Sequence, residues 1–256
     1  MIALITGASS GIGRDLAKEL AKMNYDLIVV ARSEDKLKKL KSEIEDKFKV
    51  NVDVEIADLS DEDKCKNLHK KINDNYGTID ILINNAGFGT CGKFTETDLE
   101  KELLMIKTNI TAYHILTKLF LQDMVKKDKG YILNVASIAG FMPGPLMATY
   151  YSTKAYVVRL TQSIRTELRK QKSNVRISAL CPGPVDTNFN EVADVKFSFK
   201  GQTSQFVAKN TARKIRKGRT LIFTSFSIFL YRHICKIIPD QFASYLNYYM
   251  QNRKIQ

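Results

Sequence analysis

The amino-acid sequence predicts an α/β fold: a single doubly wound parallel sheet with helices on both faces and a helical region at the C-terminal end. Two observations predict this class. Apolar strands alternate with amphipathic helices as far as residue 181, which favours parallel strands joined by crossover helices. The chain has 256 residues and is 44% hydrophobic, so it can bury one large core. We therefore expect a single domain over residues 1–256, with a variable basic and apolar segment at about 190–256.

The first strand is predicted at residues 2–6, and it runs directly into a glycine-rich turn, GASSGIG, at residues 7–13. A helical pattern of apolar residues, Leu16, Leu20 and Met23, follows this turn. Glycines there allow a tight bend, a close approach of the backbone to a phosphate group and close packing of helix on strand, while the helix N-terminus faces the anion. The turn predicts a phosphate-binding loop, and the alternative is a glycine-rich turn without a ligand.

The second strand is predicted at residues 26–31, and it ends next to Arg32 and Ser33. The elements that follow are expected as a helix at 33–47, a strand at 52–57, a helix at 60–76, a strand at 79–85, a long helical segment at 99–127, a strand at 130–137, a helix around Tyr150, a strand at 175–181, a helix from about Thr203 and a last strand at 221–223. The helix from Thr203 is expected to turn Phe206, Val207 and Ile215 inward.

Tyr150 and Lys154 are the most chemically informative residues of the chain. They stand four residues apart, so they share one face of a helix. A lysine ammonium beside a phenol favours the phenolate and lowers the phenol pKa from its ordinary value of about 10. Ser137, thirteen residues before Tyr150, is placed to hold a substrate oxygen against that phenol if it ends a neighbouring strand. The alternative is a solvated tyrosine and lysine on a surface helix.

Seven motifs occur in series along residues 2 to about 190: TGASSGIG at 6–13, Asp58 in IADLS, NNAG at 84–87, Asn109 in TNITA, Ser137, Tyr150 with Lys154, and PGPVDT at 182–187. This series resembles the short-chain dehydrogenase/reductase family, in the branch of NADP-dependent hydroxysteroid and ketoacyl-type carbonyl reductases. The resemblance implies a Rossmann-like fold and an NADP(H)-dependent oxidoreductase that transfers a hydride between nicotinamide and a carbonyl or secondary alcohol. The alternative is a non-catalytic, dinucleotide-binding regulatory protein on the same fold.

By this resemblance the catalytic residues are Asn109, Ser137, Tyr150 and Lys154. Tyr150 exchanges a proton with the substrate oxygen, and Lys154 tunes Tyr150 and anchors the nicotinamide ribose. Ser137 holds and polarises the carbonyl, while Asn109 kinks a helix and supports a water chain that reaches Lys154. Tyr151, which neighbours the pair, is expected to serve in packing.

The resemblance also implies which residues bind the cofactor. Asp58 accepts from the adenine amino group, Asn85 and its neighbours line the cofactor cleft, and Thr187 meets the nicotinamide carboxamide. The full set is Gly7, Ser9, Ser10, Gly11, Ile12, Gly13, Arg32, Asp58, Leu59, Asn85, Ala86, Gly87, Tyr150, Lys154, Pro182, Gly183, Val185 and Thr187.

Arg32 decides the predicted cofactor preference. An acidic residue at the end of the second strand would bind the ribose hydroxyls of NAD and repel a 2′-phosphate, whereas arginine pairs with phosphate in a forked geometry. NADP(H) is therefore favoured over NAD(H), with help from Ser33 or Lys36. Ser10 occupies the loop position at which many NADP-dependent family members carry a second basic residue.

Apolar and soft side chains gather around the predicted substrate site. The segment 138–149, IAGFMPGPLMAT, together with Phe88, Phe94 and Phe189, favours a small hydrophobic carbonyl or alcohol as substrate. The alternative is that several of these residues cover the sheet or form a subunit contact.

The cysteines and histidines indicate no metal site. The four cysteines form no CxxC pair, and the three histidines are dispersed, so neither a zinc site nor a disulfide framework is expected. The short apolar run at the N-terminus feeds the glycine loop and does not resemble a signal peptide, so a cytoplasmic protein is expected.

The region over residues 200–256 is strongly basic. It holds eleven Lys or Arg against one acid, Asp240, and so carries ten of the thirteen net positive charges of the chain: Lys200, Lys209, Arg213, Lys214, Arg216, Lys217, Arg219, Arg232, Lys236, Arg253 and Lys254. The ordinary interpretation is a solvated face, and the sharper one is attraction for membrane lipid, an acidic carrier or a phosphorylated substrate. No nucleic-acid recognition motif accompanies it, so no nucleic-acid partner is expected.

An apolar run lies within residues 221–250. It is too short, and too soon interrupted by Arg232 and His233, to span a bilayer. We expect a substrate lid and a contact within a homodimer or homotetramer, with peripheral membrane contact as a further hypothesis.

Overall fold

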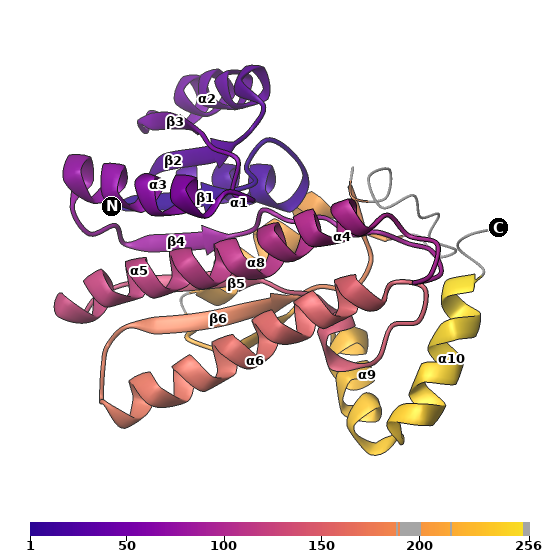
Figure 1. Ribbon diagram of the computed structural model, residues 1–256. Helices are drawn as coiled ribbons and strands as arrows, with labels where there is room; N and C mark the ends of the chain where they lie inside the picture. The colour runs from indigo at the N-terminus through magenta and orange to yellow at the C-terminus, as the bar shows by residue number, and fades with distance from the viewer. Residues whose placement is uncertain (188, 190–200, 216, 253–256) are drawn as a thin grey trace.

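The computed structural model describes residues 1–187, 189, 201–215 and 217–252. Its main sheet contains seven strands, all parallel, in the order β3-β2-β1-β4-β5-β6-β9 (Figure 1). The strands are β1 (Ile2–Thr6), β2 (Asp26–Ala31), β3 (Val52–Ile56), β4 (Ile81–Asn84), β5 (Tyr131–Val135), β6 (Arg176–Cys181) and β9 (Leu221–Phe223). The chain winds outward in both directions from β1 and β4, so the predicted doubly wound sheet and its last strand are confirmed.

Helices cover both faces of this sheet, as expected for crossover connections. One face is covered by α1 (Gly11–Ala21), α2 (Glu34–Phe48) and α8 (Ser204–Ile215), and the other by α3 (Glu62–Tyr76), α5 (Ala112–Lys126) and α6 (Ala148–Lys170). Neighbouring residues of β1 divide between the two faces. Ala3 and Ile5 belong to the core on the α1 side, while Leu4 belongs to the core on the α3 and α5 side.

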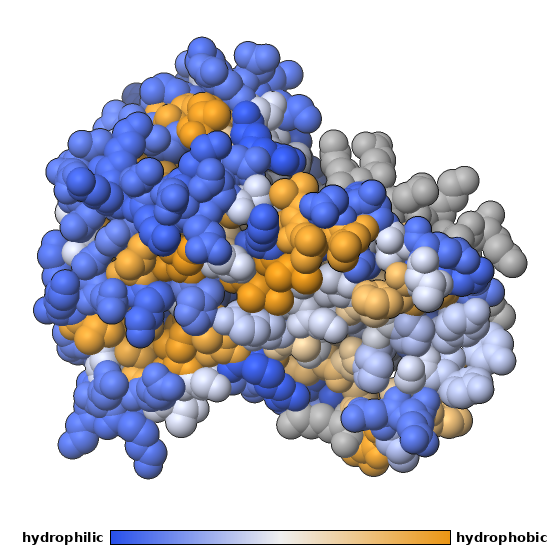
Figure 2. All heavy atoms as spheres, in the orientation of Figure 1, coloured by the Kyte–Doolittle hydropathy of each residue, from blue (hydrophilic) through white to orange (hydrophobic). Residues whose placement is uncertain are grey.

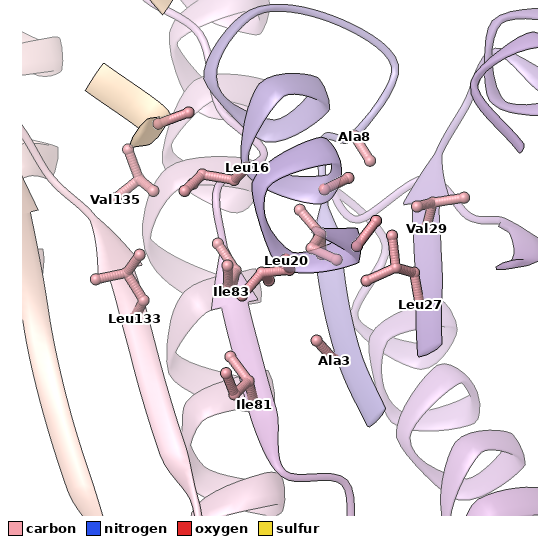
Figure 3. Close-up of a cluster of buried hydrophobic side chains, with 14 of the residues drawn as sticks. Ala3, Ala8, Leu16, Leu20, Leu27, Val29, Ile81, Ile83, Leu133 and Val135 are labelled. Carbon is pink, nitrogen blue, oxygen red and sulfur yellow. The ribbon is translucent and has the colours of Figure 1, made fainter. Parts of the chain in front are cut away.

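The apolar positions of α1 explain how its start is fixed in space. Leu16 and Leu20 are fully buried and lie over the strands, among residues that include Ile83 and Leu133 (Figure 3). The glycine-rich turn that precedes α1 is thereby held at the carboxyl end of β1. Burying a leucine of this kind contributes about 1.5–3 kcal/mol.

The long helical segment expected at 99–127 is divided. It consists of α4 (Leu99–Ile106), a π-helical turn over Lys107–Thr111, and α5. A π turn takes in more residues per turn than an α-helix and changes the direction in which the following side chains point. Asn109 lies within this turn and is fully buried.

The helix expected from about Thr203 is α8, which begins at Ser204. Val207 and Ile215 are buried as predicted, but the prediction for Phe206 is wrong, because 48% of its surface is exposed. The buried residues repeat on the helical period through Val207 and Thr211, and Phe206 falls outside that stripe. Two short strands that the sequence does not predict, β7 (Val185–Asp186) and β8 (Gln202–Thr203), pair in parallel before α8.

The basic residues at the end of α8 lie beside β9, the last strand of the sheet. Lys214 donates a hydrogen bond of 2.6 Å to the carbonyl of Phe223, and the carbonyl of Arg219, just before β9, accepts from Ser178. Among the other basic residues of this region, Lys200, Arg216, Arg253, Lys254 and the side chain of Lys236 lie outside the described residues.

The C-terminal segment forms two helices, α9 (Phe226–Ile237) and α10 (Asp240–Asn252), beyond the carboxyl ends of the strands (Figure 1). In Figure 2 the surface over these helices is largely pale or orange, whereas the surface over α2 is mostly blue. Within the described ranges, none of the helices combines the length and apolar character that crossing a membrane requires.

Candidate active site

The glycine-rich turn between β1 and α1 is closely packed against the loop after β4. Gly7 has φ +64°, and a Cβ atom on it would lie 2.8 Å from Ala86 Cα. A Cβ atom on Gly13 would lie 2.4 Å from the Gly7 carbonyl oxygen, and Gly11 also has a positive φ of +55°. These positions therefore require glycine. The turn forms a backbone cradle at the N-terminus of α1, and among the described contacts the Ser10 side chain does not cap that helix.

Asn85 fastens this turn to the loop after β4. Its Nδ2 atom donates to the carbonyl oxygens of Thr6 and Gly7, at 3.0 and 3.1 Å. In return, the Thr6 hydroxyl accepts from the backbone amides of Asn85 and Ala86, at 2.9 and 3.1 Å. The Asn85 side chain thus shapes the glycine turn.

A cavity of about 670 Å³ opens along the carboxyl ends of the strands, and it brings together most of the residues predicted for the site. The predicted residues that line it are Gly7, Ser9, Ser10, Gly11, Ile12, Arg32, Asp58, Leu59, Asn85, Ala86, Gly87, Ser137, Tyr150, Lys154, Pro182, Gly183, Val185 and Thr187. Gly13 and Asn109 are outside the lining and lie directly behind it.

The apolar part of the cavity agrees with the prediction in part: of the segment 138–149, Ile138, Ala139 and Met147 line it and the other residues do not. Phe88 and Phe189 line it, but Phe94 lies outside the lining, with 68% of its surface exposed. The sequence interpretation missed Lys101, Leu104 and Thr108, which form a wall from α4 and the π turn. They belong to the helical segment expected at 99–127, and no motif of the sequence marks them as cavity residues.

Tyr150, Lys154 and Ser137 converge from two neighbouring elements. Tyr150 lies in the first turn of α6 and Lys154 in the next turn, while Ser137 follows the end of β5. Ser137 and Tyr150 are hydrogen-bonded through their side chains. The Lys154 Nζ atom donates to the Val135 carbonyl oxygen at 2.9 Å and lies 5.8 Å from the centroid of the Tyr150 ring.

Burial dominates the titration of this pair. It raises the pKa of Tyr150 well above the ordinary value of 10, although the hydrogen bond with Ser137 opposes the rise. Burial also lowers the pKa of Lys154 to about 8. The prediction that Lys154 lowers the pKa of Tyr150 is therefore wrong for this arrangement, because the ammonium is directed at Val135 and protein atoms surround much of the phenol, which is partly buried at the cavity wall. At neutral pH the pair consists of a protonated phenol and a charged lysine.

Asn109 links the π turn to two neighbouring segments. Its Oδ1 atom accepts from the Phe88 amide at 3.1 Å, and its Nδ2 atom donates to the Phe88 carbonyl at 2.9 Å and to Thr153 Oγ1 at 3.1 Å. A Cβ atom on Gly87 would lie 2.7 Å from Asn109 Oδ1. Asn109 lies in a π turn where the resemblance implied a kinked helix, and both the kink and the role in a water chain stay predictions.

The far end of the cavity carries both charges named from the sequence. Arg32 follows β2, is exposed, and lines the cavity beside Ser33 and Lys36. Asp58 accepts from the amide and hydroxyl of Ser60, at 3.1 and 2.8 Å. Burial tends to raise the pKa of Asp58, but these bonds and the charge of Arg32 outweigh it, so the pKa is lowered and the carboxylate stays ionised.

The chain was compared with known proteins. A family profile described as short chain dehydrogenase matches residues 1–196. An uncharacterized oxidoreductase of Staphylococcus epidermidis is 33% identical over 211 residues, which are 82% of this chain and 87% of the relative. An NADP-dependent 3-hydroxy acid dehydrogenase of Schizosaccharomyces pombe is 35% identical over 81% of this chain and 79% of its own length.

Solved structures agree with the sequence comparison. A short-chain dehydrogenase from Sphingobium yanoikuyae, in complex with NADPH, superposes with a TM-score of 0.82 and 26% identity, over 93% of this chain and 96% of the other. The profile match covers most of the chain and includes the glycine turn, Ser137, Tyr150 and Lys154. The chain is a member of the short-chain dehydrogenase family.

Proposed function

We propose that this protein is an NADP(H)-dependent oxidoreductase that acts on a carbonyl or secondary alcohol of a hydrophobic compound. The observation that carries the proposal is the convergence of Tyr150, Lys154 and Ser137 on the cavity that begins at the glycine turn. A regulatory protein that only senses a dinucleotide would have no physical need for a proton donor of this kind beside the dinucleotide site.

The residues of the cavity fit a nicotinamide dinucleotide. The cradle formed by Gly7, Gly11 and Gly13 admits backbone close to a pyrophosphate, at the positive end of the α1 dipole. Asp58 is an ionised acceptor for the adenine amino group, and Thr187, beside Gly11, is assigned to the carboxamide. When bound, such a cofactor supplies the hydride.

The preference for NADP(H) rests on Arg32. Its exposed guanidinium lies at the end of β2, where Ser33 and Lys36 also line the cavity, and no acidic side chain stands at that position in the chain. A 2′-phosphate there would gain a charge-assisted pair with the guanidinium. The relative named as NADP-dependent and the neighbour in complex with NADPH support this assignment.

Tyr150 is proposed as the residue that gives a proton to the carbonyl oxygen and removes it in the reverse direction. A phenol whose pKa is raised by burial remains protonated at neutral pH, as a proton donor must be. Ser137 fixes the orientation of the phenol and shares the substrate oxygen, while Lys154 is assigned to anchoring the nicotinamide ribose. Asn109 is assigned to positioning the turn behind Lys154.

The substrate class follows from the side chains around Tyr150. Met147, Tyr151 and Phe189 line the cavity beside it, and the Phe189 ring centroid lies 5.1 Å from that of Tyr150. These side chains offer contact area and few hydrogen-bonding groups, which suits a hydrophobic ketone, aldehyde or alcohol.

A screen of ketones and aldehydes with NADPH and NADH, followed by the absorbance of the reduced nicotinamide, tests the proposal. Turnover of at least one hydrophobic carbonyl compound, faster with NADPH, is expected. Tight NADPH binding without turnover of any compound would favour the regulatory alternative.

The exposed apolar side chains of α9 and α10 bear on assembly and location. We expect a cytoplasmic homodimer or homotetramer, in which the exposed apolar side chains of α9 and α10 are covered by another subunit, and sedimentation velocity tests this.

Peripheral membrane contact is tested by flotation with vesicles that contain phosphatidylserine. Flotation of the parent, reduced when Arg213, Lys217 and Arg219 are replaced by glutamine, would support membrane contact.

A further inference from the structure

Helix α10 packs with its polar side inward. Asn247 and Gln251 are only 2% and 1% exposed, and they lie on one stripe with the buried Ala243. Phe242 and Tyr245, in contrast, are 64% and 71% exposed. A helix on the surface of a globular protein normally buries its apolar side chains. Hydrogen bonds therefore contribute more than is usual to holding α10 against the rest of the protein.

We call residues 141–151, which run from the end of the 3-10 turn into α6, the substrate wall. The buried amides of α10 form hydrogen bonds with two parts of this segment. Gln251 Nε2 donates to the hydroxyl of Tyr151. Asn247 Nδ2 donates to the Pro143 carbonyl at 2.7 Å and also contacts the sulfur of Met142 at 3.3 Å. Tyr151 lines the cavity, and Met142 and Pro143 belong to the segment that joins the lining residues Ala139 and Met147.

Helix α9 supports the same wall. The hydroxyl of Tyr231 contacts the Met142 sulfur at 3.2 Å. The Arg232 guanidinium lies 5.7 Å from the ring centroid of Phe141, the last residue of the 3-10 turn Ile138–Phe141. Residues 141–143 are therefore held from outside by both C-terminal helices.

The wall and Tyr151 form one packed unit. A Cβ atom on Gly144 would lie 2.1 Å from Tyr151 Cγ, so the ring rests directly on the backbone of the wall segment. Tyr151 and Met147 line the cavity, and the Tyr151 ring is edge-on to Tyr150 with centroids 6.1 Å apart. Burial raises the pKa of Tyr151, and hydrogen bonds from Asn247 and Gln251 oppose the rise. A shift of α10 would therefore move the surface that a substrate meets beside Tyr150.

We infer that Gln251 and Asn247 are positioning residues for the substrate wall, and that Tyr151, held by them, limits the size of the group that a carbonyl substrate can carry beside Tyr150. This inference rests on the proposed function and names the part of the chain that sets its specificity. The sequence interpretation assigned Tyr151 to packing alone. In the structure, the packing of Tyr151 also determines how much space a substrate has beside Tyr150.

Two aryl ketones of different size, acetophenone and butyrophenone, measure this limit. Replacing Tyr151 with alanine opens the wall, and the ratio of kcat/KM for butyrophenone to that for acetophenone should rise about tenfold. Gln251→Leu removes the bond to Tyr151 and should raise the same ratio about threefold, through a lower KM for butyrophenone. The control is Asn252→Leu, an exposed neighbour on α10, which should leave the ratio unchanged. An equal change for both ketones in Gln251→Leu would overturn the specificity role.

Hydrogen exchange of the full chain, without substrate, tests the positioning separately from turnover. In Gln251→Leu and Asn247→Leu, the amides of residues 142–151 and of α10 should exchange faster than in the parent, while residues 7–13 stay unchanged. Unchanged exchange at 142–151 would refute the positioning role even in an active enzyme. If the parent reduces neither ketone nor any other carbonyl compound, the proposed function and the specificity role both fall, and the exchange result still decides whether the amides hold the wall.

Discussion

Lys154 donates a hydrogen bond of 2.9 Å to the carbonyl oxygen of Val135, the last residue of β5. This bond fixes the ammonium at the carboxyl end of the sheet, 5.8 Å from the centroid of the Tyr150 ring. One carbonyl replaces only part of the hydration that the ammonium loses on burial, and so the pKa of Lys154 falls from 10.5 to about 8.

The lowered pKa of Lys154 predicts a pH-dependent stability. Between about pH 8 and pH 10.5 the unfolded chain retains a proton that the folded chain has released, so the free energy of unfolding rises with pH across this window. The contribution is on the order of 3 kcal/mol. Denaturant unfolding at pH 7, 8.5 and 10 should show the free energy of unfolding of the parent rising relative to that of Lys154→Met, since groups such as the buried Cys65 and Cys181 act alike in both proteins. Lys170→Met, an exposed position of α6, should follow the parent, and parallel curves for the parent and Lys154→Met would contradict the prediction.

Tyr150→Phe removes the proposed proton donor and keeps its ring against Phe189. Turnover should fall by about 10²- to 10⁴-fold. The Kd for NADPH, followed by nicotinamide fluorescence in a chain that contains no tryptophan, should change less than about twofold. Tyr156→Phe, two turns further along α6, should retain normal turnover. Near-normal turnover in Tyr150→Phe would remove Tyr150 from its assigned role.

Arg32→Ala tests the cofactor preference. Loss of a charge-assisted pair with a 2′-phosphate should raise the Kd for NADPH about 10- to 100-fold and leave the Kd for NADH nearly unchanged. Lys39→Ala, an exposed cation on the neighbouring helix α2, serves as the matched control. Equal affinity of the parent for NADPH and NADH would count against Arg32, as would an Arg32→Ala variant with unaltered NADPH affinity.

Gly13→Ala tests the packing behind the cradle. The added carbon would lie 2.4 Å from the Gly7 carbonyl oxygen, so the turn must move. We expect a loss of cofactor affinity together with a loss of about 1–3 kcal/mol in stability, measured by denaturant unfolding. In Gly183→Ala the new carbon meets the flexible end of Ile228, at 2.9 Å, and the loss of stability should be smaller. Comparable losses in the two variants would show that the clash at Gly13 is not decisive.

Contiguous motifs made much of the fold and site predictable. The strand, glycine turn and helix at residues 2–21 are local, and the sequence places Tyr150 and Lys154 on one helix face without help from the rest of the chain. The alternation of apolar strands with helices gave the parallel sheet, including β9.

Other features depend on contacts that no short stretch of sequence contains. The bond between Gln251 and Tyr151 joins residues one hundred positions apart, and it required the placement of α10. The pKa of Tyr150 was predicted in the wrong direction, because spacing to Lys154 reveals proximity but not the extent of burial. Phe206 was expected inside because apolar residues usually are, and the helical stripe that α8 buries excludes it.

The polar attachment of α10 sets this helix apart from the apolar sheet core in how it should respond to cold. Apolar burial loses strength on cooling, whereas bonds such as those of Asn247 and Gln251 do not depend on that effect. Lowering the temperature should therefore weaken the core packing around Leu16 and Leu20 more than the attachment of α10. We therefore expect cooling to change the shape of the substrate wall less than it reduces the stability of the sheet core.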